Sequence, residues 1–162
     1  MRETLLLAGD PAGKNTNSAR LTTPITPTFM PHSPENPAPN TTVLIAEDDP
    51  VFRRVLVAAV AQLGVQIETV GNGNEAYERI HRGGVDFLVL DHQMPLCSGI
   101  ELLERMVSET SNEVRMPPTV LCTAKGFEID GPALSKRFNL VGILHKPFSA
   151  TQLGQLISQN LR

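Results

Sequence analysis

The stretch VDFLVLDHQMPLCSG, residues 85–99, joins a short apolar run to an acidic residue, a turn and the start of a helix. Val85–Leu90 has the length and apolar character of a strand that is buried on both faces. Asp91 follows at once, and a proline and Gly99 indicate a tight loop before an amphipathic helix that we expect to reach Ser108. This stretch therefore predicts a strand, a loop and a helix, with a carboxylate at the carboxyl end of the strand.

The same strand-and-helix pattern occurs on both sides of this stretch. The predicted strands cover residues 42–46, 66–70, 85–90, 118–123 and 141–145. The predicted helices cover residues 50–64, 74–81, 100–108, 130–138 and 150–160. Buried strands that alternate with helices form parallel sheets with helices on both faces. We therefore predict an α/β domain with a doubly wound five-stranded parallel sheet flanked by five helices.

The composition limits the domain organisation and the location of the protein. Seven of the thirteen prolines lie in residues 1–40, where Phe29 is the one aromatic residue, so we expect a disordered Pro-rich leader before a folded domain at residues 41–162. The longest apolar run, Val55–Ala61, has seven residues, too few for membrane insertion. A formal net charge of −3 gives no reason to expect direct nucleic-acid binding. Two cysteines without a signal peptide indicate a cytoplasmic protein.

Polar residues follow the predicted strands at the edge where parallel strands end. They are Glu47 and Asp48 after the first strand, Asp91 after the third, Thr123 at the end of the fourth and Lys146 after the fifth. Three carboxylates that meet at one edge of a sheet repel one another unless a proton or a cation lies between them. Mg²⁺ prefers such oxygen ligands, and the ammonium group of Lys146 adds a second positive charge. This set predicts a site for a dianion such as a phosphoryl group.

The residues at these strand ends form a series of short motifs. They are Glu47-Asp48-Asp49, Asp91-His92-Gln93-Met94-Pro95 followed by Gly99, Thr123-Ala124, and Lys146-Pro147-Phe148. In this order, residues 42–161 resemble the receiver domain of bacterial two-component response regulators. The resemblance implies a flavodoxin-like strand order 2-1-3-4-5. It also implies a phosphoprotein that works in phosphorelay signal transduction.

The resemblance implies a role for each acidic residue. Asp91 would be the phosphoacceptor, whose carboxylate attacks the phosphorus of a phosphohistidine and becomes an aspartyl phosphate. Mg²⁺ would be the cofactor, bound by Asp48, Asp91 and the backbone carbonyl of Gln93. Glu47 would bind the ion directly or through water.

The resemblance also implies roles for Lys146 and Thr123. Lys146 would pair with Asp91 before the transfer and with the phosphoryl group after it. Thr123 would donate its hydroxyl to the phosphoryl group, and the resulting movement of its loop would be the conformational switch. The Lys146–Pro147 bond is expected to be cis.

The resemblance further implies partners. The phosphoryl group would come from a sensor histidine kinase or a histidine phosphotransfer protein, and the signal would pass to a downstream protein target. Only sixteen residues follow Lys146, so we expect a stand-alone receiver without a DNA-binding output domain. Such a protein catalyses its own phosphoryl transfer and dephosphorylation and is not otherwise an enzyme. Homodimerisation through the last two helices stays open.

Two positions depart from the usual receiver pattern. Ile143 lies three residues before the lysine, where receivers usually have Tyr or Phe, so the output of the switch is in doubt while the phosphorylation chemistry is not. Gln93 and Lys125 lie two residues beyond Asp91 and Thr123, and together they are expected to obstruct the water that hydrolyses the aspartyl phosphate.

Three other functions share features with this sequence. Residues 71–76, GNGNEA, fit a dinucleotide-binding loop, although Glu75 would repel a pyrophosphate in the first helical turn. Aspartate-nucleophile phosphatases carry a second Asp two residues after the nucleophile, where this chain has Gln93. The alternative that stays open is a receiver-like protein-interaction module that works without phosphorylation, because Ile143 replaces the usual aromatic residue.

Overall fold

The computed structural model of the chain describes residues 40–109, 115–124 and 130–161. The predicted leader lies outside the described residues except for Asn40, and so does Lys125. Among the described helices, none has the length and apolar character that crossing a membrane takes.

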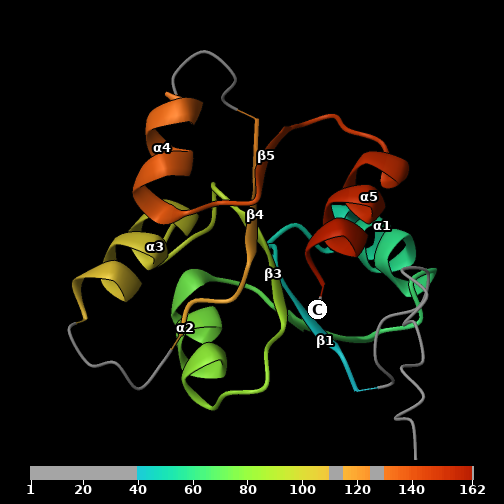
Figure 1. The fold of residues 1–162 in the computed structure, drawn as a ribbon, viewed down its shortest axis with the longest axis horizontal. Coiled ribbons are helices and arrows are strands. Elements are labelled where there is room, and N and C mark those ends of the chain that lie inside the picture. Colours follow the sequence, from blue (N-terminus) through green and yellow to red (C-terminus); the bar gives the residue numbers. More distant parts are fainter. Residues whose placement is uncertain (1–39, 110–114, 125–129, 162) are drawn as a thin grey trace, which may run out of the picture. The chain divides into compact units, whose positions relative to one another are not determined.

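Five strands and five helices alternate along the described residues (Figure 1). The strands are β1 (Thr42–Ala46), β2 (Gln66–Val70), β3 (Phe87–Asp91), β4 (Thr119–Thr123) and β5 (Gly142–His145). The helices are α1 (Pro50–Ala61), α2 (Gly73–His81), α3 (Gly99–Ser108), α4 (Gly131–Phe138) and α5 (Ala150–Asn160). All strand pairs are parallel, and the sheet order is β2-β1-β3-β4-β5. The predicted fold class and strand order are confirmed.

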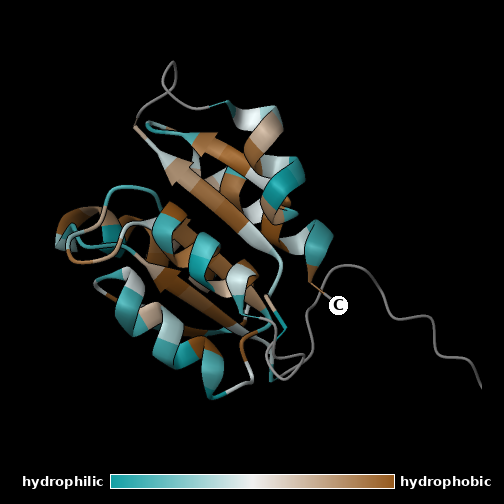
Figure 2. Cartoon of the chain, turned by 90° about the vertical axis from the view of Figure 1, so that its left-hand side faces the viewer, coloured by the Kyte–Doolittle hydropathy of each residue, from teal (hydrophilic) through white to brown (hydrophobic). Residues whose placement is uncertain are grey.

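The helices cover the two faces of the sheet unequally. Helices α1 and α5 pack on one face, and α2, α3 and α4 pack on the other (Figure 1). Successive strand side chains point to opposite faces, so Val43 and Ile45 of β1 join the core under α1 and α5, whereas Leu44 and Ala46 join the core under the other three helices. Figure 2 shows the result, with apolar strands enclosed by helices that turn hydrophilic faces outward.

Side-chain caps set the starts of the helices that surround the carboxyl edge of the sheet. Asp49 accepts hydrogen bonds from the N–H groups of Val51 and Phe52 and so caps α1. Ser98 caps α3 and Ser149 caps α5, each in a capping box with the residue three positions later. These caps fix the residue at which each helix begins after its strand. The helices therefore begin beside the edge of the sheet where the polar residues lie.

Two element boundaries differ from the prediction by more than one residue. The third strand begins at Phe87 instead of Val85, because the carboxylate of Asp86 accepts the N–H of Thr42 at 2.8 Å and takes the place of a backbone partner. Helix α1 ends at Ala61, before the predicted residue 64, because the chain turns through a left-handed Gly64 with φ 70°.

Candidate functional site

The end of β1 brings two acidic residues to the carboxyl edge of the sheet. The N–H of Glu47 donates to the carbonyl of Val70 at 3.1 Å, so the pairing of β1 with β2 continues one residue beyond the strand. Glu47 is therefore held inside the domain and is 1% exposed, whereas Asp48 next to it is exposed. One acidic group is thus fixed in the protein, and the other faces solvent.

Asp91 is the last residue of β3, the central strand, and it is buried. Its register partner is Cys122 of β4, and the N–H of His92 extends the pairing to the carbonyl of Cys122 at 2.8 Å. The N–H of Gln93 then turns back and donates to Asp91 Oδ2 at 3.0 Å. The sheet and the following loop together fix the orientation of the Asp91 carboxylate.

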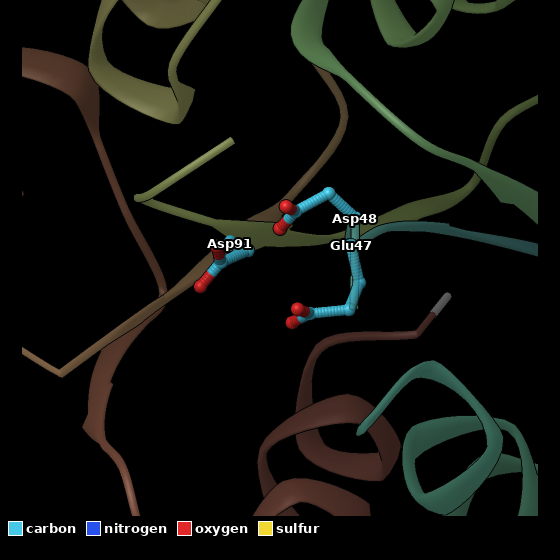
Figure 3. A group of neighbouring side chains, drawn as sticks. All are labelled: Glu47, Asp48 and Asp91. Carbon is cyan, nitrogen blue, oxygen red and sulfur yellow. The ribbon is translucent and has the colours of Figure 1, made fainter. Parts of the chain in front are cut away.

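The three carboxylates converge at this edge. One ligand oxygen from each of Glu47, Asp48 and Asp91 lies within 4.8 Å of the others. In Figure 3 the carboxylates of Glu47 and Asp48 extend to the side on which Asp91 lies. The structure thus brings together the acidic residues that the sequence placed at two different strand ends.

Lys146 enters the same cluster from the end of β5. Its backbone N–H donates to the carbonyl of Thr123 at 2.8 Å, which holds the residue beside the end of β4. Its Nζ lies 2.8 Å from Asp91 Oδ1 and 2.8 Å from Glu47 Oε2. The predicted pairing of Lys146 with Asp91 is present, and the equal contact with Glu47 was not predicted. Thr123 itself ends β4 and is buried.

The loop between Asp91 and α3 closes tightly around the site. The N–H of Gly99 donates to the carbonyl of His92 at 3.1 Å, and Met94 is buried in the core below. Leu96 has a left-handed backbone with φ 66° and an 84% exposed side chain. On the other side of the site, the Lys146–Pro147 bond is cis, as expected.

Burial and the contacts between Lys146 and its carboxylate partners act in opposite directions on the pKa values of Glu47 and Lys146. Burial raises the pKa of Glu47 above its ordinary value of 4.5, the nearby charge of Asp91 acts in the same direction, and the hydrogen bond from Lys146 opposes both. Burial alone would lower the pKa of Lys146, but its hydrogen bonds to Asp91 and Glu47 outweigh that effect and raise the pKa above 10.5. Lys146 is therefore a stable cation at neutral pH.

The donor set fits a hard divalent cation. Three carboxylates face one ammonium group, so the fully ionised cluster carries an excess of two negative charges. All of the side-chain donors are oxygens, which Mg²⁺ prefers, and exposed Asp48 leaves a side of the cluster open to solvent. The predicted backbone ligand is the carbonyl of Gln93, a residue whose N–H already contacts Asp91.

An aromatic residue that the sequence analysis missed also lies at this site. Phe52 is in the first turn of α1, and the centre of its ring is 4.2 Å from Lys146 Nζ. Phe148 contacts the same ring edge-on, with 5.7 Å between the ring centres. The available signal was the position of an aromatic residue in the first turn of the helix that follows the acidic motif.

The glycine-rich segment 71–76 serves the packing of α2. The carboxylate of Glu75 accepts the N–H of Gly71 at 2.9 Å, so an acidic side chain occupies a donor that a pyrophosphate would use. A Cβ atom on Gly73 would lie 2.6 Å from the carbonyl oxygen of Cys97, so this glycine allows α2 to approach the loop before α3.

Comparisons with known proteins agree with this arrangement. The family model of the response regulator receiver domain matches residues 43–158. The response regulator receiver protein CpdR of Brucella abortus is 31% identical over 120 residues, which cover 74% of this chain and 95% of that protein. The chemotaxis protein CheY4 of Vibrio cholerae has the same fold, with a TM-score of 0.63, 24% identity, and coverage of 75% of this chain and 98% of that one.

Several relatives are much longer than the matched region. The hybrid signal transduction histidine kinase K of Dictyostelium discoideum is 33% identical over 123 residues, but the match covers only 10% of its length. The DNA-binding transcriptional regulator NtrC of Azospirillum brasilense is 28% identical over 120 residues, which are 24% of its length. The match is thus to one domain of these proteins.

The fold and the acidic edge define a doubly wound α/β domain whose site suits a divalent cation and a phosphoryl group. The family match covers most of the chain. The protein belongs to the response regulator receiver domain family of two-component signal transduction. Phosphoacceptor function is the general property of this family, and the acidic cluster is compatible with Mg²⁺ binding.

Proposed function

We propose that this protein accepts a phosphoryl group on Asp91, in a reaction that needs Mg²⁺. The observation that carries the proposal is the position of Asp91, a buried carboxylate with an ammonium group 2.8 Å away and two further acidic residues that each place one oxygen within 4.8 Å of an Asp91 oxygen. A buried carboxylate with a fixed cation and a divalent-metal site suits the transfer of a dianion. We assign the metal to Glu47, Asp48, Asp91 and the backbone carbonyl of Gln93.

In the proposed reaction, an Asp91 oxygen attacks the phosphorus of a phosphohistidine. A new P–O bond forms, the P–N bond breaks, and the imidazole leaves with its electron pair and takes a proton. When bound, Mg²⁺ stabilises negative charge on the transferring oxygens. Lys146 neutralises the carboxylate before the transfer and a phosphoryl oxygen after it.

The proposed output is a conformational switch read by another protein. Thr123, at the end of β4, would donate its hydroxyl to the phosphoryl group and draw the following loop inward. The donor would be a sensor histidine kinase or a histidine phosphotransfer protein, and a downstream protein target would bind the switched form. Ile143 is half-buried and packs against the core under α4, so we expect this switch to work without an aromatic rotation.

The test is intact-mass measurement after incubation with Mg²⁺ and acetyl phosphate. We expect one added phosphoryl group on the wild type, and none on Asp91→Asn or after chelation of Mg²⁺. Asp49→Asn is the matched control, because it removes a neighbouring acidic charge, and asparagine caps a helix as well as aspartate does. This control should be phosphorylated like the wild type.

Two outcomes would contradict the proposal. Phosphorylation of Asp91→Asn to the wild-type extent would place the phosphoacceptor elsewhere. No adduct on the wild type with acetyl phosphate or with a range of histidine kinases would favour the receiver-like interaction module that works without phosphorylation.

A further inference from the structure

We propose that Phe52 is a positioning residue for Lys146 in phosphoryl transfer. The inference rests on the proposed function, because it concerns the lysine that would neutralise the transferred group. Lys146 Nζ lies 4.2 Å from the centre of the Phe52 ring, inside the distance of about 6 Å at which a cation is attracted to an aromatic face. The ring is thus a third contact of the ammonium group, beside Asp91 and Glu47.

The protein holds the Phe52 ring in place from two directions. Phe52 is half-buried in the first turn of α1, which Asp49 caps through the N–H of Phe52 itself. The ring of Phe148 meets the ring of Phe52 at 83°, the edge-to-face geometry that aromatic pairs prefer. Because Phe148 follows Lys146 by two residues, the same short segment places both the ammonium group and the residue that orients the ring.

The ring suits a cation that changes its partner during a reaction. A hydrogen bond to a carboxylate weakens steeply when it is bent, whereas a cation is attracted to a ring over a range of positions above the ring face, within about 6 Å of its centre. Lys146 can therefore turn from Asp91 toward a phosphoryl oxygen and stay over Phe52. Its side chain is only 20% exposed, so little water is available to replace a lost contact.

A purely structural role is the competing explanation, since Phe52 also packs against the core under α1 and α5. The two roles differ in their dependence on Lys146. A positioning role requires the ammonium group, so loss of the ring should matter only when Lys146 is present. A packing role affects the protein equally with or without the lysine.

The test is a double-mutant cycle on the rate of phosphorylation by acetyl phosphate. We expect Phe52→Leu to slow the reaction roughly 3- to 10-fold, and Phe52→Tyr, which keeps an aromatic face, to stay within about 2-fold of the wild type. In a Lys146→Met background, the same Phe52→Leu change should alter the remaining rate by less than about 2-fold. An equal loss in both backgrounds would overturn the proposal.

A second measurement does not depend on phosphorylation. An aromatic face shifts the NMR signals of the Lys146 ε-methylene protons upfield, and we expect Phe52→Leu to abolish this shift and Phe52→Tyr to keep it. An unshifted lysine in the wild type would overturn the contact itself. If the wild type shows the shift but forms no adduct with any donor, the assignment of Phe52 to phosphoryl transfer falls together with the proposed function, and the contact alone stands.

Discussion

Replacement of Gly99 by alanine tests how tightly the loop after Asp91 is built. A Cβ atom at this position would lie 2.4 Å from the carbonyl oxygen of Asp91 and 3.1 Å from Cγ of Leu90. The first of these atoms belongs to the backbone of the central strand, so it cannot rotate away as a side chain would. Either the end of β3 or the start of α3 has to move.

The size of the effect follows from these contacts. Overpacking of a core by one methyl group costs about 1–3 kcal/mol when the backbone has to shift. The shift also strains the hydrogen bond from Gly99 N–H to the carbonyl of His92, which measures 3.1 Å. Alanine favours a helix over glycine, but this benefit is small at the first helical residue. We therefore expect Gly99→Ala to lower the free energy of unfolding by about 2 kcal/mol.

The assay is urea denaturation at equilibrium, followed by circular dichroism. Gly154→Ala is the matched control, because Gly154 lies inside α5 and a Cβ atom there would have its nearest neighbour, Leu63 Cδ2, at 3.9 Å. This control should raise the free energy of unfolding by about 0.5–1 kcal/mol. The reasoning is refuted if Gly99→Ala unfolds at the same urea concentration as the wild type or at a higher one.

Two further predictions concern stability. Leu96 has φ 66° and is 84% exposed, so Leu96→Gly should relieve backbone strain and raise the free energy of unfolding by about 0.5–1 kcal/mol in urea; an equal gain in Leu96→Ala would contradict this reason. Hydrogen bonds from Arg79 lower the pKa of Glu68 below its ordinary value of 4.5. The pairing of Arg79 with Glu68 therefore stabilises the protein above pH 4.5, and this stabilisation is lost as the pH falls through the pKa of Glu68 in the folded protein. Glu68→Gln should therefore cost about 0.5–1 kcal/mol near pH 7 and almost nothing near pH 3, and a cost independent of pH would disprove the assignment.

The fold could be predicted because its strands are short apolar runs that end at polar residues. Thr42–Ala46 and Gln66–Val70 have the predicted bounds, since each is closed by turn or capping residues that are visible in the sequence. The start of β3 could not be predicted in the same way. Asp86 pairs through its side chain with a residue 44 positions away, and no local pattern indicates such a contact.

The candidate site was predictable to a similar degree. Parallel strands carry their last residues to one edge, so Asp91 and Lys146 were expected to meet, and they do at 2.8 Å. The contact of Lys146 with Glu47 joins residues 99 positions apart, and it depends on the length and rotamer of both side chains. The contact of Phe52 with Lys146 depends in the same way on how the first turn of α1 lies beside the residue that follows β5.

The two contacts that the sequence did not predict act on the same problem in the proposed reaction. Lys146 is largely buried, and a buried cation that loses its partner is strongly destabilising. When Asp91 takes up a phosphoryl group, its carboxylate becomes an aspartyl phosphate. Lys146 then loses this carboxylate as a partner. Glu47, directly after β1, and the ring of Phe52, in α1, are not altered by the transfer, so Lys146 keeps a carboxylate and an aromatic face while it changes its third partner. The buried lysine can then follow the phosphoryl group without a step in which it stands unpaired.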